Sequence, residues 1–224
     1  VDCLTKEAMV VGVKIMTEFS VVELLKKEDK GLVTFRGGES MLCDQVLVTT
    51  GGGTSVDSYN WLRKLDIAIV NPVPSLFTFN IPDFRLNGLQ GISIPDVTVR
   101  MEGAKNQQSG PLLITHWGFS GPSILKSSAW AARELNMVSY NFTIHINFVP
   151  KFKEEELRDF FQEVKVLHPK KTVSLNSYFD LSKRLWERIV SIAAIDEELK
   201  WGDMSNKSIN KLVEELHRGS YVVK

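Results

Sequence analysis

The sequence has 224 residues, 43% of them hydrophobic, and its 27 lysines and arginines balance 27 aspartates and glutamates. A chain of this length can bury the core of one large domain or two small ones, and zero net charge gives no global electrostatic argument for nucleic acid or an anionic membrane. Cys3 and Cys43 form no metal or redox spacing. No apolar run could cross a bilayer, and no signal-peptide pattern is present. The ordinary hydrophobic fraction predicts a globular protein, and two distant cysteines without a disulfide framework fit a reducing cytoplasm.

The N-terminal segment predicts a helix followed by a small antiparallel ribbon. Residues 1–11 have the amphipathic spacing of the last turns of a helix, which Gly12 closes. Residues 13–16 are expected to form a strand. The strands of the ribbon are expected at 20–25 and 32–35. Because the chain opens with valine, directly inside the amphipathic run, we expect it to be a fragment of a longer protein.

The next segment, Asp44–Gly53, is a continuous apolar run that ends in three glycines. Apolar residues without alternation are typical of a strand buried on both faces, as in a parallel sheet, and such sheets bind ligands at the carboxyl ends of their strands. Thr50, Gly51 and Gly52 are therefore candidate ligand contacts, with a flexible loop as the alternative. The glycine spacing does not match a dinucleotide fingerprint, and no Walker A motif occurs.

Beyond this run the pattern predicts short elements punctuated by prolines. A short helix is expected within residues 57–70. Strands are expected at 76–79, 97–101, 112–115 and 138–149. The last of these alternates between apolar and polar residues, which places His145 on its solvent side.

The segment Thr115–Pro122 combines a strand end, two glycines and a proline-initiated helix. Pro122 suits the first helical turn, with Ser120 or Gly121 as the cap, and the free N–H groups of a helix start attract negative charge. An anionic group could therefore dock here. The alternative is that Gly118 and Gly121 only turn the chain, and that the His116 ring is a hydrogen-bonded structural group.

Residues 151–224 predict three amphipathic helices with apolar stripes, the third capped by Ser205 or Asn206. Three compact helices raise the possibility of a helix-turn-helix DNA reader. This segment carries 14 basic and 13 acidic residues in mixed order, which gives a net charge of only +1. Because DNA-binding surfaces normally show a basic stripe, we do not favour that reading.

Three segments together resemble a known family. Asp44–Gly52, Pro72–Phe77 and Thr115–Pro122 match, in order and approximate spacing, the HI0933-like (BaiN-type) NAD(P)/FAD-dependent oxidoreductases. The Thr-His-x-Gly-x-Ser-Gly-Pro element is the specific one, and the resemblance covers essentially the whole chain. Two departures stand out: Thr49 replaces a usual alanine, and the region after Gly53 lacks a longer glycine- and serine-rich stretch.

The resemblance implies an α+β multidomain fragment. Residues 1–71 would be a partial FAD-binding α/β, Rossmann-like portion, 72–150 an inserted β-barrel-like domain, and 151–224 the helical part of the insert. Residues 221–223 would fall where the chain leaves the insert.

The resemblance further implies a flavoprotein, an NAD(FAD)-utilizing dehydrogenase that transfers electrons between NAD(P)H and an organic acceptor through FAD, with the fragment itself inactive. Its partner would be a small-molecule substrate, with no nucleic acid, membrane or metal. Thr50, Gly51 and Gly52 would approach the cofactor, and His116 would be a catalytic proton donor. The other implied contacts on the flavin or substrate side are Thr115, Gly118, Ser120 and Gly121. The alternative function is a noncatalytic binding or scaffold module.

Overall fold

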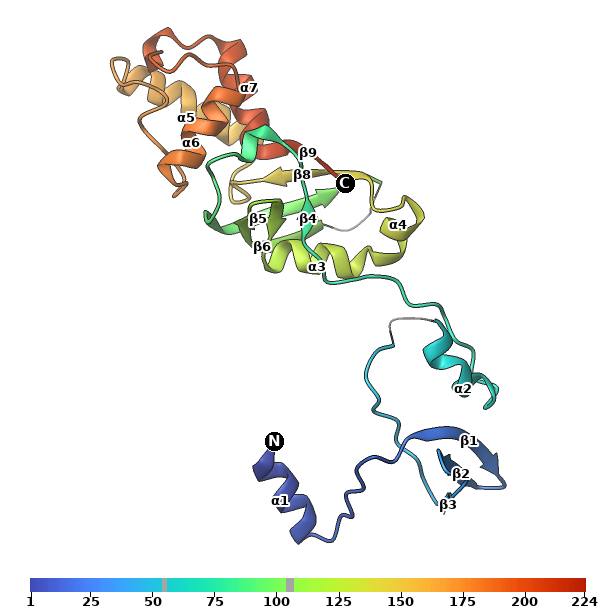
Figure 1. Ribbon diagram of the computed structural model, residues 1–224. Helices are drawn as coiled ribbons and strands as arrows, with labels where there is room; N and C mark the ends of the chain where they lie inside the picture. Colours follow the sequence, from blue (N-terminus) through green and yellow to red (C-terminus); the bar gives the residue numbers. More distant parts are fainter. Residues whose placement is uncertain (54–55, 104–106) are drawn as a thin grey trace. The chain divides into compact units, whose positions relative to one another are not determined.

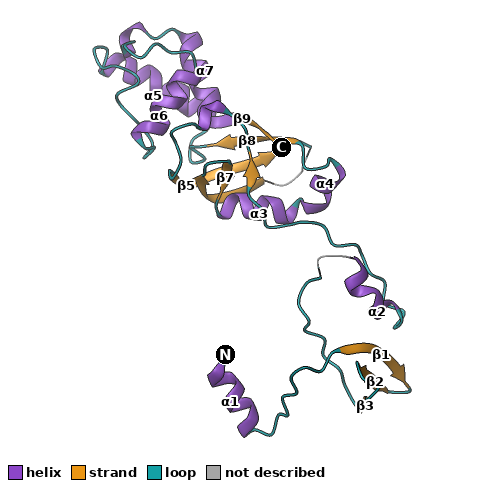
Figure 2. Cartoon of the chain, viewed as in Figure 1, coloured by secondary structure: helices purple, strands orange, loops and turns teal. Residues whose placement is uncertain are grey.

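The computed structural model describes residues 1–53, 56–103 and 107–224, and it divides the chain into two compact units (Figure 1). The first unit spans Val1–Pro72 and the second spans Val73–Lys224. Helices and strands occur in both units (Figure 2).

The first unit contains the expected N-terminal helix and antiparallel ribbon. Helix α1 spans Asp2–Val10, and three strands pair in the order β1-β2-β3. These strands are β1 (Val21–Lys27), β2 (Lys30–Phe35) and β3 (Ser40–Cys43). They are followed by the short helices η1 (Val56–Tyr59) and α2 (Asn60–Arg63). Of the described hydrophobic residues in this unit, only Leu24 and Val33 are buried, so its core is small.

The predictions of a strand at Asp44–Gly53 and of another at residues 13–16 are wrong, because neither segment forms a strand in the structure. Neither segment pairs with another strand among the described residues. The Leu47 side chain is 88% exposed, although a strand of a parallel sheet would be covered on both faces. Apolar composition predicts burial only where a neighbouring strand supplies the backbone partners, and no described segment does so here.

The second unit is built on a six-stranded antiparallel sheet with the order β4-β7-β6-β5-β8-β9. The backbone N–H of Lys224, which follows β9, donates to the carbonyl of Asn80 in β4 at 3.0 Å. The two edge strands of the sheet therefore meet, and the sheet curls into a barrel-like shape. The strands are β4 (Phe79–Asn80), β5 (Ser93–Met101), β6 (Gln107–Ile114), β7 (Gly118–Ser120), β8 (Phe142–Asn147) and β9 (Gly219–Val223).

Alternation along these strands places one set of side chains inside the barrel. Phe79, Leu112, Phe119 and Ile144 are each 0% exposed. The ring of Phe119 meets that of Tyr221 edge to face, with centroids 4.9 Å apart. This apolar interior is the main driving force for closing the sheet.

Helices α3 (Pro122–Trp130) and α4 (Ala132–Met137) lie between β7 and β8, and η2 (Phe84–Leu86) follows β4. The strand expected at 138–149 starts later, because Ser139 and Tyr140 adopt positive φ angles of 52° and 60° and form a turn. Within β8 the expected alternation is present, and His145 lies on the outer face with partial exposure.

The three expected helices are present as α5 (Glu154–Leu167), α6 (Lys183–Ile192) and α7 (Asn206–Arg218), with η3 (Trp201–Asp203) before α7. They enclose an aromatic cluster in which the ring of Phe161 stacks on that of Trp201, with the ring centroids 5.3 Å apart. The Trp186 indole N–H donates to the carbonyl of Val173 at 2.8 Å. After α7 the chain returns to the sheet, where residues 221–223 pair with β8. The resemblance placed these residues at the exit from the insert.

The fold class is therefore confirmed as a mixture of helices and strands with a barrel-like sheet. The partial FAD-binding, Rossmann-like portion expected for residues 1–71 is not shown, because the paired strands among residues 1–53 and 56–72 form only the antiparallel ribbon. None of the described helices is long and apolar enough to cross a membrane.

Helix capping gives a first testable expectation. Ser205 caps α7, since its hydroxyl accepts the backbone N–H of Ser208 at 3.1 Å. We expect Ser205→Ala to lower the free energy of unfolding by about 1 kcal/mol. Ser182 caps α6 with a longer bond of 3.4 Å, so Ser182→Ala should cost less. Urea denaturation of both variants measures this, and an equal or reversed order would contradict it.

Candidate functional site

The turn between β6 and β7 is fixed by three hydrogen bonds. The backbone N–H and the hydroxyl of Thr115 both donate to the carbonyl of Gly118, at 2.8 and 3.0 Å. The N–H of Ile81 donates to the carbonyl of Trp117 at 2.7 Å, which ties the turn to the chain after β4. The turn therefore holds its tip, His116 and Trp117, in a defined position.

Both glycines of this turn are required by close packing. Gly118 has φ 148°, and a Cβ there would lie 2.7 Å from the backbone nitrogen of Ile81. Gly121 has φ 100°, and a Cβ there would lie 2.8 Å from the carbonyl oxygen of Pro111. Glycine is the residue that permits such approaches at positive φ. Their presence is thus explained without a ligand.

Helix α3 begins as the sequence predicts, with Pro122 in its first turn and Gly121 as the cap. Ser120 is half-buried at the end of β7, and His116 is exposed. Among the residues that the structure describes, no hydrogen bond joins the His116 ring to a partner. The Trp117 side chain beside it is 60% exposed, with the two ring centroids 6.4 Å apart.

The other predicted contacts, Thr50, Gly51 and Gly52, belong to the first unit, whereas the turn belongs to the second. They line a hollow of about 600 Å³ whose other walls include Tyr59 and Trp61. A Cβ at Gly51 or Gly52 would meet no atom within 4 Å, and Gly51 has φ 74°. Their backbone is accessible to a ligand.

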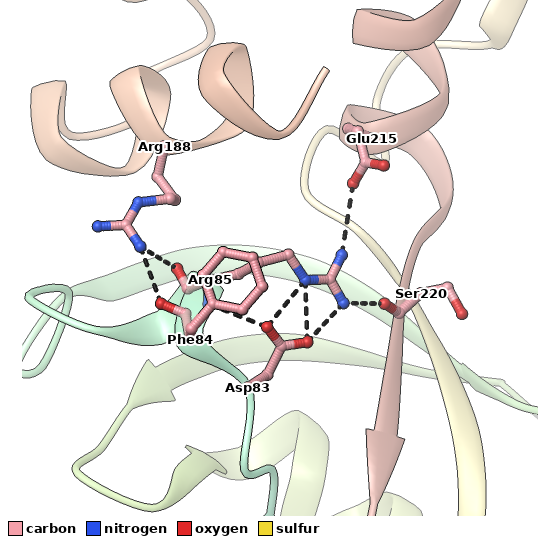
Figure 3. Close-up of polar contacts among 6 residues, drawn as sticks. All are labelled: Asp83, Phe84, Arg85, Arg188, Glu215 and Ser220. Carbon is pink, nitrogen blue, oxygen red and sulfur yellow. Dashed lines mark hydrogen bonds and ion pairs between the residues drawn. The ribbon is translucent and has the colours of Figure 1, made fainter. Parts of the chain in front are cut away.

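A polar network joins the barrel to the helical part (Figure 3). The Arg85 guanidinium donates to the Asp83 carboxylate at 2.7 Å and to the carbonyl of Ser220, and it lies 3.9 Å from the Glu215 carboxylate. The same guanidinium lies 4.4 Å from the centre of the Tyr221 ring. Arg188 of α6 donates to the carbonyls of residues 84, 85 and 87. Two arginines thus anchor η2 to α6, α7 and β9.

This network shifts the pKa values of its acids in opposite directions. Burial alone would raise the pKa of Asp83, but hydrogen bonds from the side chain and backbone of Arg85, together with its charge, hold it below the ordinary value of 3.8. Burial raises the pKa of Glu215, and the charge of Arg85 only partly offsets that. Arg85 therefore stabilises the charged form of Asp83 more than that of Glu215.

The depressed pKa of Asp83 predicts an acid-dependent loss of stability. A carboxylate with a lower pKa in the folded state stabilises the fold above its unfolded pKa, and this contribution disappears as the pH falls through the folded value. We expect Asp83→Asn to be less stable than the wild type at neutral pH but to lose less stability between about pH 5 and pH 2. Thermal unfolding across this range measures it, and parallel pH profiles would contradict the assignment.

A second hollow, of about 530 Å³, lies on the outer face of the sheet. Strand pairing sets Thr98 opposite Asn147 and Arg100 opposite His145. The remaining lining residues are Glu102, Gly103, Gln107, Glu154, His217 and Arg218. Sequence reasoning placed His145 on this face but missed the hollow, since the pairing of β5 with β8 is not visible in either strand alone.

Two curated relatives, both named ribosomal RNA dihydrouridine synthase, are similar to this chain. The Escherichia coli (strain K12) protein is 26% identical over 201 residues, which cover 85% of this chain and 46% of the relative. The Haemophilus influenzae (strain ATCC 51907 / DSM 11121 / KW20 / Rd) protein is 27% identical over 233 residues, which cover 99% of this chain and 55% of the relative. The chain thus spans about half the length of the curated relatives that it matches.

These relatives overturn the expected function. They are named for modifying ribosomal RNA, so the expected dehydrogenase acting between NAD(P)H and an organic acceptor is wrong. The expectation of no nucleic-acid partner is wrong for the same reason, and the nucleic-acid-binding alternative comes closer. That expectation relied on the resemblance and on net charge, and net charge averages over the chain and does not report how individual polar groups are arranged on one surface.

The resemblance to HI0933-like proteins is itself confirmed. A sequence model of the family described as "HI0933-like protein barrel and H2TH domain" matches residues 73–224, which is more than half of the chain and coincides with the second unit. The curled six-stranded sheet and the helices α5, α6 and α7 lie within this match. The chain therefore belongs to the HI0933-like family, with its barrel and H2TH domain in residues 73–224.

Proposed function

We propose that this chain is part of an enzyme that reduces uridine in ribosomal RNA to dihydrouridine, and that residues 73–224 contribute to binding the RNA. The observation that carries the proposal is the similarity to two relatives of that name, one of them matched over 99% of this chain. The barrel and H2TH domain supports it, because a half-polar sheet face and a helical part offer extended surfaces for a nucleic acid.

The chemistry calls for a hydride donor and a proton donor. Saturation of the C5–C6 double bond of uracil adds one hydride and one proton, so two electrons enter the base and no group leaves. A reduced flavin supplies a hydride of this kind when it is bound. The accessible backbone at Gly51 and Gly52 fits the close approach of such a group, since no described atom lies where a Cβ would stand.

Residue roles follow from this assignment. Thr50, Gly51 and Gly52 would lie against the flavin. In the turn before α3, the exposed His116 ring would give its proton to the base, and its neighbours in the turn would hold it in place. Those neighbours are Thr115, Gly118, Ser120 and Gly121. The hydrogen bonds of Thr115 and the packing of both glycines support a positioning role.

Complementation tests the proposal. The complete gene product is expressed in an Escherichia coli strain that lacks its ribosomal RNA dihydrouridine synthase, and dihydrouridine in purified ribosomal RNA is measured by mass spectrometry of nucleosides. We expect dihydrouridine to reappear, and His116→Gln to reduce it at equal protein level. Soluble protein without any dihydrouridine would overturn the enzymatic proposal.

A further inference from the structure

We propose that the hollow on the outer face of β5 and β8 binds one unstacked nucleotide of single-stranded RNA. The inference rests on the proposed function, because it names a place where the RNA substrate is held. The hollow has a volume of about 530 Å³, within the usual range for small-ligand pockets. Its walls come from β5 and the residues after it, from β8, from the start of β6, and from α5 and α7.

The hollow offers a cation that is available to a ligand. Arg100 is exposed at the hollow, and it has no ion pair among the described residues. Glu154 on the rim is already engaged, since it lies 2.8 Å from Arg158 and 3.4 Å from His217. The Arg100 guanidinium is therefore free to bind a phosphate of the RNA backbone, for which its planar set of donors is well suited.

His145, which lines the hollow, has a buried nitrogen without a partner. Its Nδ1 atom is inaccessible to solvent, and no described group forms a hydrogen bond with it. A buried polar atom without a partner costs free energy, and a bound group recovers it once the ring turns toward the hollow. A neutral imidazole with its proton on Nε2 would then present Nδ1 as an acceptor to a ring N–H of a nucleobase.

The lining also combines charged groups with an amide. Asn147 accepts the backbone N–H of Val149 through Oδ1 at 2.9 Å, which leaves its NH₂ group to donate to a base carbonyl. The carboxylates of Glu102 and Glu154 would repel a bare anion. The Glu102 carboxylate can accept a hydrogen bond from a ribose hydroxyl or an exocyclic amine, so the lining matches a whole nucleotide better than free phosphate.

Binding of a fluorescein-labelled 12-nucleotide uridine-rich RNA to the complete gene product tests the inference by fluorescence anisotropy. We expect Arg100→Gln to raise Kd about tenfold, and the DNA of the same sequence to bind more weakly than the RNA. Lys126→Gln is the matched control, because Lys126 is exposed on α3 and does not line the hollow. It should change Kd less than about twofold. Circular dichroism confirms that both variants fold.

Photocrosslinking gives an independent readout. RNA that contains 4-thiouridine should crosslink to peptides from β5 and β8, and crosslinks confined to other peptides would overturn the inference. Equal affinities for Arg100→Gln and Lys126→Gln would also overturn it, although RNA binding by the wild type would keep the proposed function. Conversely, weakened binding by Arg100→Gln without restored dihydrouridine in cells would support the hollow and reject the enzymatic activity.

Discussion

Replacing Gly118 with alanine should destabilise the second unit by about 3 kcal/mol, a large part of the total stability of a typical domain. A Cβ at this position would lie 2.7 Å from the backbone nitrogen of Ile81 and closer still to the carbonyl oxygen of Phe79. Backbone atoms of a sheet cannot move aside as a flexible side chain can. The φ angle of 148° adds strain for any residue with a Cβ.

Gly91→Ala is the control that measures the cost of a positive φ angle without a steric clash. Gly91 also has a positive φ, 84°, but a Cβ there would meet no atom within 4 Å. We expect this variant to lose about 1 kcal/mol. Equilibrium unfolding in urea, followed by tryptophan fluorescence, compares the two. If both glycines tolerated alanine equally, close packing would not explain Gly118.

Replacement of Arg85 by methionine should also lower the free energy of unfolding by a large amount. Arg85→Met keeps much of the apolar stem but leaves Asp83 without its charged partner, and both side chains are less than one fifth exposed. Breaking a buried pair on one side costs about 3 to 5 kcal/mol, and partial exposure reduces this to about 2 to 3 kcal/mol here. The loss of the contact with the Tyr221 ring acts in the same direction.

Arg218→Met provides the comparison with a surface pair. The Arg218 guanidinium lies 3.4 Å from Glu214, and both side chains are more than half exposed. Its replacement should cost less than about 0.5 kcal/mol. The difference between the two variants should shrink at acid pH, where Asp83 is protonated. A constant difference down to about pH 2 would show that packing, not the ion pair, sets the Arg85 effect.

Local signals predicted the parts of the fold that depend on local physics. The helices of 154–167, 183–192 and 206–218 follow from apolar stripes at helical spacing, and Ser205 from capping preference. Pro122 marked the start of α3 correctly. By contrast, the apolar run 44–53 carried no information about whether a partner strand was present, and the structure shows none among the described residues.

The candidate sites were harder to predict because they depend on pairing across the chain. The sequence identified the turn 115–122 but left open why its glycines are needed. The positions of Phe79 and Ile81 explain Gly118, and the position of Pro111 explains Gly121. Arg100 and His145 face each other through strands that are far apart in sequence. Neither residue type at its own position indicates a site.

The position of β9 also bears on how the second unit folds. Its partner β8 ends at Asn147, whereas β9 begins at Gly219, and the whole helical part lies between them. Closing so long a segment costs conformational entropy before the strand pairing repays it, and non-local contacts of this kind slow folding. During synthesis the barrel therefore stays open until the helices have left the ribosome, and until then β8 has an edge without its β9 partner, which can pair with another chain.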